Sequence, residues 1–431
     1  MSQTSRRTAG YIGHLKKRLN VSKLAELRKQ LEEDKSPLPK RVPRGNDLSQ
    51  EGVERRRAFL REEGCCPEML CKDLPEIEPE QLKGVIENSI GYTSIPVGVI
   101  GPLRVRGLYA AGDYFVPFAT TEGALVASYH RGAYVVSRNG GVTSLCVSES
   151  ISRAPAFTFD SIIEAGIFIE WTMTQLDTFK SLAAETTRHG ELIEISQTLN
   201  SNTVFLSFDY ETADAAGQNM VTVATERVCR WIVENTPVKP MHWYVEGNFS
   251  GDKKATMLSF ISHRGRKVVA EAELAAVDVK RFLHSTPEAM VEYYRVSNMG
   301  AIQSGSIGVQ GQYANALAAI FLCTGQDVAC LSEASVGVTT MQVRPNGNLY
   351  VSVSLPNLTV GTVGGGTFLP GARDALRMLD CEGSGNASKF AEICGAAVLA
   401  GEVSIIAAMT GGDFAKAHTI FRANAVKPQP S

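Results

Sequence analysis

The chain has no run of about 20 uncharged apolar residues, the length that a helix needs to cross a bilayer. The nearest run lies at residues 393–409, but it is rich in small residues and Glu402 interrupts it. We therefore expect a buried core helix in this region and no membrane-spanning segment.

A strong excess of charge of one sign is also missing. The chain has 43 basic and 45 acidic residues, and its net charge of −2 excludes the overall basic field typical of nucleic-acid-binding proteins. We expect no nucleic-acid partner. Hydrophobic residues make up 44% of the 431 residues, as in folded soluble proteins. This length predicts about two or three domains and a sizeable core.

Cysteine is present, but not in the pattern of a disulfide framework. The nine cysteines are unevenly spaced, which favours a reducing compartment, and we expect a cytoplasmic protein. Cys65, Cys66 and Cys71 lie close together, but no second group of ligands completes a zinc pattern. We expect no metal site.

The N-terminal region predicts helices separated by prolines. The first 25 residues contain no acidic side chain, so a transit peptide is one interpretation. The favoured interpretation is an amphipathic helix, because apolar residues recur at helical spacing, at Ile12, Leu15, Leu19, Leu24, Leu27 and Leu31. A second helix is expected at about 49–63, beyond a proline-rich linker. Residues 1–74 form a predicted N-terminal helical module.

Between residues 154 and 244, short apolar strands alternate with two longer helical patterns. The predicted order is β-α-β-β-α-β, which is typical of a split βαβ, ferredoxin-like domain. Asp160 is expected to cap the first helix. No Gly-x-Gly-x-x-Gly sequence follows a predicted strand, so a Rossmann domain is disfavoured. The predicted strands are 154–159, 192–199, 204–210 and 241–245, and the predicted helices are about 161–182 and 215–234.

The remaining chain mixes strands with long helices of small residues, which together predict an α+β fold. We expect strands at 115–121 and 351–355 and a long apolar helix at 387–409. The segment 361–367 is too rich in glycine for regular structure and suits a close approach of backbone to a ligand.

A loop at 245–256 contains two glycines, an aspartate and two adjacent lysines. The glycines permit backbone conformations that a helix or a strand excludes. Such a loop can hold the ammonium of Lys253 or Lys254 near a carbonyl oxygen that becomes negative during a reaction. Asp252 can form a charge-assisted contact with either lysine. A solvated turn is the alternative, since lysines are mostly exposed.

Two segments of the predicted small domain suit an anionic ligand. Residues 214–219 open its second helix, where free amides can bind a phosphate. Thr187 and Arg188 offer a hydroxyl and a guanidinium, and guanidinium groups bind phosphate in a bidentate manner. The alternatives are a simple helix cap for Asp214 and the polar rim of a hairpin for Arg188.

Two further polar residues have structural alternatives to a chemical role. Glu122 lies at a predicted helix start, where a carboxylate interacts favourably with the helix dipole. His418 lies in a predicted C-terminal helix, where a lone histidine is usually a surface residue.

Taken together and in this order, these motifs are specific to one family. The sequence resembles the catalytic part of class I 3-hydroxy-3-methylglutaryl-coenzyme A (HMG-CoA) reductases. The resemblance extends from Glu87 to His418, which is most of the chain. The matching segments are Glu87-Asn88, 90–92, 95–98, 119–123, Gly247-Asn248, 252–254, 305–308, 325–327 and 361–367.

The resemblance implies how these parts are arranged. A large domain around a long central helix would comprise residues 75–153 and 257–431. A ferredoxin-like, NADP-binding domain at 154–244 would be inserted into it, and residues 245–256 would form the connecting loop with the catalytic lysine. Active sites of this family lie between two subunits, so a homodimer or a larger assembly is implied. The soluble members of the family are the ones that the chain resembles.

The resemblance also implies a reaction and its residues. The family reduces HMG-CoA to mevalonate and free coenzyme A with two NADPH, through a hemithioacetal and an aldehyde. Lys253 would neutralise the oxygen that becomes negative when hydride adds, and Asp327 would orient Lys253 and tune its pKa. Glu122 would donate a proton to an oxygen. His418 would protonate the departing thiolate.

Binding residues are implied by position. NADPH would contact four residues, with Arg188 on the 2′-phosphate: Thr187, Arg188, Asp214 and Asn219. The acyl-CoA substrate would contact six residues: Ser128, Arg131, Arg153, Asp252, Lys254 and Asn315.

The sequence departs from the family at the expected acyl pocket. Glu246 replaces a serine that helps to hold the acyl carboxylate, and its charge is expected to repel that group. Val296 replaces a lysine, and residues 310–312 replace an Asn-Ala-His stretch. Cys330 stands where relatives often have His or Gln. Two alternatives stay open: a reductase of another acyl thioester, and a non-catalytic acyl-CoA-binding or regulatory relative. Arg153 argues against a complete loss of carboxylate recognition.

Overall fold

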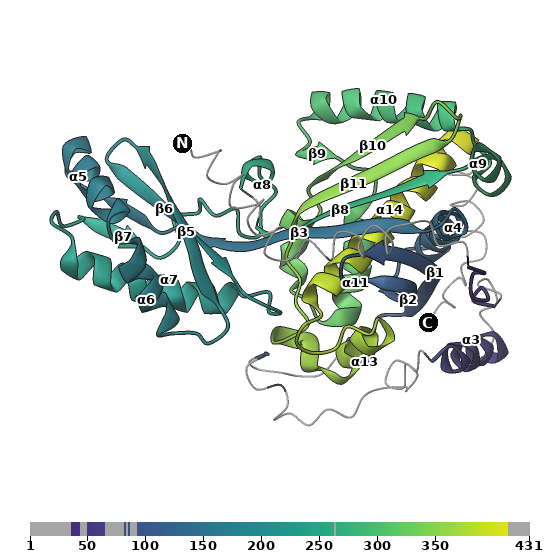
Figure 1. Ribbon diagram of the computed structural model, residues 1–431, viewed down its shortest axis with the longest axis horizontal. Coiled ribbons are helices and arrows are strands. Elements are labelled where there is room, and N and C mark those ends of the chain that lie inside the picture. The colour runs from purple at the N-terminus through teal and green to yellow at the C-terminus, as the bar shows by residue number, and fades with distance from the viewer. Residues whose placement is uncertain are drawn as a thin grey trace, which may run out of the picture.

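The structure is a computed structural model that describes residues 36–43, 50–64, 82, 85–86, 93–262 and 264–412 (Figure 1). The predicted first helix, the three clustered cysteines, the motif at 87–92 and His418 lie outside these residues. The predicted second helix is confirmed as α3 (Gln50–Glu62). Its Phe59 and Leu60 pack against Phe115 and Met378 of the larger part of the molecule.

One long helix, α14 (Ala387–Gly411), forms the centre of that larger part, and the predicted helix at 387–409 is thereby confirmed. By length and composition alone α14 could cross a membrane. Of its most apolar stretch, however, 83% is buried inside the protein, so it is a core helix. Figure 1 shows it crossing behind the sheet, with other helices around it.

A mixed sheet lies against α14. Its order in this region is β3-β8-β11-β10-β9, with β1 next to β3 and β2 next to β1. The predicted strands at 115–121 and 351–355 are confirmed within β2 and β11, whereas the other strands were not predicted. The bounds are β1 (Val97–Gly107), β2 (Ala111–Ala119), β3 (Val142–Arg153), β8 (Gly265–Leu274), β9 (Gly308–Val309), β10 (Gly337–Val343) and β11 (Leu349–Leu358).

Helix α4 crosses α14 at very short range. At Gly132 of α4, an added Cβ would lie 1.9 Å from the carbonyl oxygen of Ala400 in α14. At Gly401 an added Cβ would lie 2.1 Å from the ring of Tyr129. Glycine at both positions is therefore what permits this close crossing. The helices of this region are α4 (Leu125–Arg138), α9 (Ala276–Leu283), α10 (Pro287–Ser304), α11 (Tyr313–Thr324) and α13 (Pro370–Met378).

A buried carboxylate on α14 fixes the β1–β2 hairpin. Glu392 is fully buried and accepts hydrogen bonds from the amides of Leu108, Tyr109, Ala110 and Cys146, at 2.8–3.2 Å. Burial raises the pKa of this carboxyl group to about 7, against the effect of the four amides. The hairpin is thus attached to the core by polar contacts as well as by apolar packing.

The smaller part of the molecule contains the predicted β-α-β-β-α-β order of elements. Its strands follow the order β7-β4-β6-β5, and every neighbouring pair is antiparallel. The first predicted helix is divided into two helices, with a break after Met173. The elements are β4 (Ala156–Thr158), α5 (Ile162–Met173), α6 (Leu176–Ala184), β5 (Glu191–Asn200), β6 (Thr203–Glu211), α7 (Gln218–Asn235) and β7 (His242–Tyr244).

The predicted cap of the first helix is wrong by one residue. Ser161, not Asp160, is the N-cap of α5, and its hydroxyl accepts a hydrogen bond from the amide of Glu164 at 3.2 Å. The Glu164 carboxylate in turn accepts from the amide of Asp160. These contacts differ from a capping box in one respect: the glutamate accepts from the amide of the residue before the N-cap, and not from the amide of the N-cap itself.

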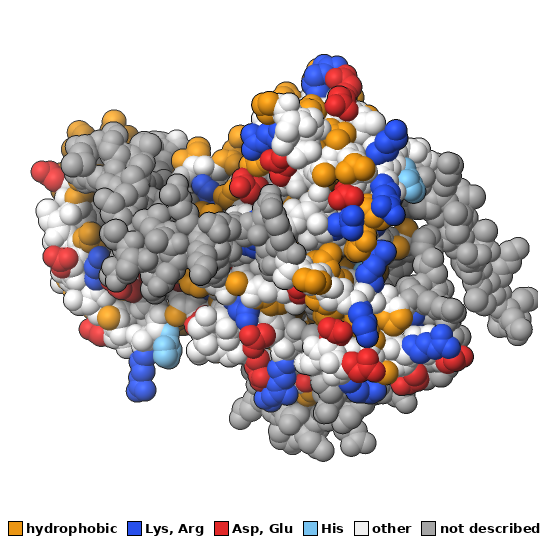
Figure 2. Space-filling model, turned by 45° about the vertical axis from the view of Figure 1, so that its right-hand side comes forward, with side chains coloured by type: hydrophobic (Ala, Val, Ile, Leu, Met, Phe, Trp, Pro, Cys, Tyr) orange, Lys and Arg blue, Asp and Glu red, His pale blue; other side chains and the backbone are white. Residues whose placement is uncertain are grey.

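Strand β3 joins the two parts. Its residues from Thr143 to Ser150 pair with β8, while Ile151, Ser152 and Arg153 pair with β6 of the smaller part. Arg153 therefore lies where the two parts meet. On the face in Figure 2, acidic and basic side chains are interspersed, without a broad region of one sign.

Candidate active site

The loop after β7 brings Lys253 to Asp327. The Lys253 ammonium lies 2.7 Å from Asp327 Oδ2, and each side chain keeps about two-fifths of its surface exposed (39% and 41%). The hydrogen bond to Asp327 raises the pKa of Lys253 above its ordinary value. The site therefore holds a charged ammonium that solvent or a ligand can reach.

Asp327 is held in place by the backbone around it. It follows Gly325, which ends α11 in the left-handed conformation at φ 66°, and it caps the short helix η2 (Val328–Cys330). One of its oxygens, Oδ1, accepts from the amide of Ala329 at 3.0 Å, which leaves Oδ2 for Lys253. Gln326 exchanges two hydrogen bonds with the backbone of Gly361, at 2.8 and 3.0 Å.

Among the described residues, neither Lys253 nor Lys254 pairs with the Asp252 carboxylate, so the contact that the sequence permitted is not formed. Its carboxylate lies between two guanidinium groups, 3.1 Å from Arg153 Nη1 and 2.9 Å from Arg264 Nη2. Two guanidinium groups outcompete a flexible lysine because they are fixed by further contacts and have a planar set of donors. Lys254 is exposed and donates to the backbone carbonyl of Asp252.

Arg264 continues the network into the interior. It is almost fully buried, and its Nη1 donates to both oxygens of Glu333, at 2.7 and 2.9 Å. Glu333, on α12 (Leu331–Ala334), is also completely buried, and desolvation raises its pKa. A side-chain oxygen of Glu333 also accepts from the backbone amide of Lys253 at 3.3 Å.

Glu246 is paired rather than isolated. Its Oε2 accepts from Arg153 Nη1, from the amide of Ala154 and from the hydroxyl of Ser250, at 2.9–3.3 Å. Its negative charge is therefore partly neutralised by Arg153, which weakens the repulsion expected for an acyl carboxylate. Within the described residues, Arg153 Nε and Glu246 Oε1 are buried without a hydrogen-bond partner.

Glu122 lies in the loop between β2 and α4. Its side chain is exposed, and its amide donates to the Thr120 hydroxyl. In the part of the chain that the structure describes, no hydrogen bond or ion pair joins Glu122 to Lys253. Ala119, just before this loop, packs against Cys323 near the end of α11. The loops that carry Glu122 and Asp327 therefore begin from neighbouring positions in the core.

The residues predicted to bind substrate lie on three separate parts of the chain. Arg153, Asp252 and Lys254 lie around Lys253, as described above. Ser128 and Arg131 lie on α4 instead, where both contact Ser404 of α14. Asn315 lies in the first turn of α11, and its amide donates to the carbonyl of Gln312.

Three of the four residues predicted to bind NADPH lie together. The Thr187 hydroxyl is 2.9 Å from Met220 Sδ, which brings its loop to the first turn of α7. Arg188 and Asn219 are exposed there. Helix α7 has Gly217 as its N-cap and no side-chain cap, so its first amides remain available to an anion. This donor set fits a phosphate group.

Asp214 does not cap α7, the helix that follows it. Its carboxylate accepts from the amides of Gly385 and Ala387 at 2.7 and 3.1 Å, and so caps the N-terminus of α14. The carbonyl of Asp214 accepts from the amides of Thr362 and Val363. The glycine-rich segment approaches this loop closely at Gly361, where an added Cβ would lie 2.6 Å from the amide nitrogen of Ala216. Its predicted approach to a ligand stays a prediction.

Three residues of the network next to the Lys253 loop could not be recognised from the sequence. Arg264, Glu333 and Gln218 have no motif of their own, and Gln218 donates to the buried thiol of Cys330 at 2.6 Å. Burial raises the pKa of that thiol, which therefore stays protonated. The one available signal was Glu333 itself, a charged residue in an otherwise apolar and small-residue segment.

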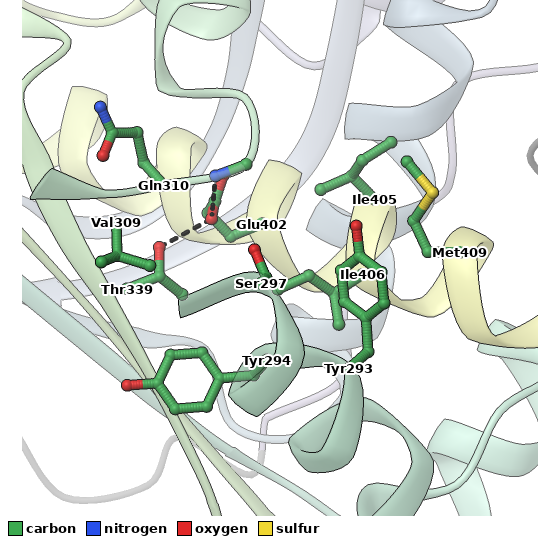
Figure 3. Close-up of a pocket in the computed structure, with 11 residues that line it drawn as sticks. Tyr293, Tyr294, Ser297, Val309, Gln310, Thr339, Glu402, Ile405, Ile406 and Met409 are labelled. Carbon is green, nitrogen blue, oxygen red and sulfur yellow. Dashed lines mark hydrogen bonds between the residues drawn. The ribbon is translucent and has the colours of Figure 1, made fainter. Parts of the chain in front are cut away.

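A separate, small pocket of about 70 Å³ lies between α10 and α14 (Figure 3). Glu402 lies at its base and accepts hydrogen bonds from Thr339 and from the amides of Gly311 and Gln312. The segment 310–312, where the sequence departs from the family, is thus fixed to α14. Neither Lys253 nor Asp327 lines this pocket.

Comparisons with known proteins agree with one another. A model of the family "Hydroxymethylglutaryl-coenzyme A reductase" matches residues 52–423. The chain is 42% identical over 348 residues to the 3-hydroxy-3-methylglutaryl-coenzyme A reductase of Methanocaldococcus jannaschii, covering 79% of this chain and 85% of that relative. It is also 42% identical over 350 residues to that of Pyrococcus abyssi, covering 79% and 86%.

The fold is similar to that of a solved reductase. The class II 3-hydroxy-3-methylglutaryl-CoA reductase from Streptococcus pneumoniae, solved bound to NADPH, superposes with a TM-score of 0.66 at 17% sequence identity. The superposition covers 85% of this chain and 99% of that one.

Proposed function

The chain belongs to the hydroxymethylglutaryl-coenzyme A reductase family, and we propose that its Lys253–Asp327 pair supports the reduction of HMG-CoA. The overall reaction converts HMG-CoA to mevalonate and free coenzyme A with two NADPH. The observation that carries this proposal is an exposed, charged ammonium held 2.7 Å from a carboxylate. NADPH supplies the hydride that adds to the carbonyl carbon.

Lys253 stabilises the carbonyl oxygen of the substrate. When hydride adds to a thioester or aldehyde carbon, the oxygen becomes negative, and a fixed ammonium stabilises it without reorganisation. The raised pKa of Lys253 keeps the ammonium protonated at neutral pH. Asp327 limits the orientations of the lysine, because its other oxygen is fixed by the amide of Ala329.

Protons come from other groups in this proposal. Glu122 donates a proton to an oxygen of the substrate, and His418 protonates the thiolate of coenzyme A. Glu122 approaches the substrate from the loop before α4 and not through a contact with Lys253. Its exposure supports a role in contact with a ligand.

NADPH binds at the first turn of α7. Arg188 and Asn219 would contact its phosphate groups, with Thr187 and the free amides of α7 nearby. Asp214 contributes indirectly, because its side chain is occupied at the start of α14.

The acyl group binds near Arg153. Arg153 lies at the junction of the two parts beside Glu246 and Asp252, and its guanidinium would supply the positive charge for the acyl carboxylate. We assign the chain to class I, which is supported by the motif resemblance and by 42% identity to archaeal relatives against 17% to the class II structure. A cytoplasmic location is supported by the six described cysteines, all unpaired and buried.

We further propose that the enzyme is a homodimer or a larger assembly with shared sites. Helix α10 has 18 residues, of which only Pro287 and Met290 are buried. Val296 is 49% exposed and Ile302 is 75% exposed, which leaves apolar surface for a second subunit. Mixing Lys253→Ala with Glu122→Gln subunits tests whether one site takes these two residues from different subunits: activity recovered in the mixture supports this arrangement, and no recovery opposes it.

The function itself is tested by replacing the lysine. Lys253→Ala should abolish oxidation of NADPH in the presence of HMG-CoA while NADPH binding, followed by its fluorescence, is retained. Lys280→Ala removes an exposed lysine of α9 and should leave turnover unchanged. Full activity of Lys253→Ala would exclude the proposed role. A panel of acyl thioesters in the same assay decides the substrate, since activity only with uncharged acyl chains would identify another thioester reductase.

A further inference from the structure

The segment from Asp327 to Glu333 contacts Lys253 at both ends of the residue. Asp327 binds the ammonium at 2.7 Å, and Glu333 accepts from the backbone amide at 3.3 Å. These two acidic residues lie on consecutive short helical elements, η2 and α12. One rigid segment therefore determines both where the main chain of Lys253 lies and where its side chain points.

The main chain of Lys253 needs such support. Its φ of 55° is in the left-handed region, which residues other than glycine rarely occupy. A conformation of this kind persists only where surrounding contacts impose it. The carboxylate of the preceding residue, Asp252, is held by Arg153 and Arg264. The backbone amide of Lys253 itself donates to Glu333.

Arg264 connects these contacts. Its guanidinium contacts Glu333 with one nitrogen and Asp252 with the other, at 2.7 and 2.9 Å. Its own amide donates to Asn357 Oδ1 at 2.7 Å, and Glu333 accepts additionally from the Thr359 hydroxyl. Both charged groups are withdrawn from solvent, so their geometry cannot relax easily after a change.

We propose that Arg264 and Glu333 are a buried pair of positioning residues, which hold the backbone at Asp252 and Lys253 so that the Lys253 ammonium stays against Asp327. The inference rests on the proposed reductase function, and it assigns to the pair no contact with substrate or cofactor. Its effect on the reaction is exerted through Lys253 alone.

Glu333→Gln tests the inference with a side chain of the same shape. The amide oxygen can still accept from Lys253, but the charge that fixes Arg264 is lost. We expect kcat to fall about 10- to 100-fold, because a displacement of about 1 Å at a reacting group has this size of effect. The KM for NADPH should change less than about twofold, since the α7 region is untouched. Arg264→Lys, which cannot reach Asp252 and Glu333 together, should behave alike.

Asp113→Asn is the matched control. Asp113 pairs with the buried guanidinium of Arg104 through two hydrogen bonds of 2.8 Å, away from Lys253. This variant should lower Tm to an extent similar to Glu333→Gln and leave kcat unchanged. Equal losses of kcat in the two variants would show that the effect is general destabilisation and would overturn the inference.

A double-mutant cycle separates positioning from a merely structural role. In an Asp327→Asn background the ammonium has lost its target, so Glu333→Gln should reduce kcat by less than about threefold further. If the losses of kcat from the two single substitutions multiplied in the double variant, the inference would be overturned.

The last readout does not depend on turnover. Release of Lys253 from Asp327 lowers its pKa, so modification of Lys253 by an amine-reactive reagent, followed by peptide mass spectrometry, should be several-fold faster in Glu333→Gln. An unchanged rate would overturn the inference. A wild-type chain without activity on any thioester, together with the faster modification, would instead refute only the proposed function.

Discussion

Gly132→Ala is predicted to damage both the fold and the site. In the native structure, a Cβ at this position would lie 1.9 Å from the carbonyl oxygen of Ala400, about 1.5 Å closer than the 3.4 Å at which ordinary contact begins. The clash is with the backbone of α14, which is buried along most of its length. Helix α4 must therefore move away from α14 by more than about 1 Å.

The expected loss of stability follows from three contributions. Overpacking in a core costs about 1–3 kcal/mol. The contacts of Ser128 and Arg131 with Ser404 are stretched, at about 1 kcal/mol each. Alanine recovers about 1 kcal/mol as the better helix former. The net loss is about 2–4 kcal/mol, which corresponds to a decrease in Tm of roughly 5–15 °C for a domain of this size.

Activity should fall as well, because α4 begins just after Glu122. In the proposed role of Glu122, a displacement of about 1 Å would reduce turnover about 100-fold. Thermal unfolding followed by circular dichroism and NADPH oxidation with HMG-CoA measure the two effects.

The matched control is Gly166→Ala. Gly166 lies inside helix α5, and an added Cβ there meets no atom within 4 Å. This substitution should raise stability by about 0.5–1 kcal/mol through helix propensity alone. If Gly132→Ala were as stable and as active as the wild type, the close crossing of α4 and α14 would be wrong.

Three further predictions concern titration, cofactor choice and the lysine. Burial raises the pKa of Glu392 from 4.5 to about 7, so between these pH values the folded chain holds a proton that the unfolded chain has released. The free energy of unfolding should therefore fall by about 3 kcal/mol as pH rises from 4.5 to 7. This slope should be absent in Glu392→Gln. Arg188→Gln should raise the KM for NADPH about 10- to 100-fold, which corresponds to the free energy of a hydrogen bond to a charged group, and should leave the KM for NADH unchanged. An equal change for both cofactors would contradict the contact of Arg188 with the 2′-phosphate. Asp327→Asn should lower kcat and move the alkaline limb of its pH profile to lower pH, because Lys253 loses the hydrogen bond that raises its pKa; an unmoved limb would contradict that cause.

Elements with a strong local pattern could be predicted. The apolar run at 387–409, the two hairpin strands of the smaller part and helix α7 were all found close to their bounds in the structure. Strands β3, β8 and β10 were not predicted. Their half-buried faces mix serine, threonine and charged residues with apolar ones, so local alternation is weak, and pairing with neighbours from distant parts of the chain establishes them.

The candidate site shows the same division. The motifs around Lys253 and Asp327 implied that these two residues meet, and the structure places them 2.7 Å apart. A lysine was a possible partner for Asp252 because two lysines are its neighbours in sequence. In the fold it meets two arginines instead, which are about 100 and 12 residues away in the chain.

The sequence alone therefore determined the class of fold, the identity of the central helix and the chemical groups available for reduction of a thioester. These depend on side-chain periodicity and on residue type, which are local properties. Only the tertiary structure decided that Asp214 caps α14, that Glu246 is neutralised by Arg153, and that Arg264 and Glu333 support the loop of Lys253. Partner choice among buried charges depends on which distant segments are packed together, because a buried charge requires whichever opposite charge the fold brings to it.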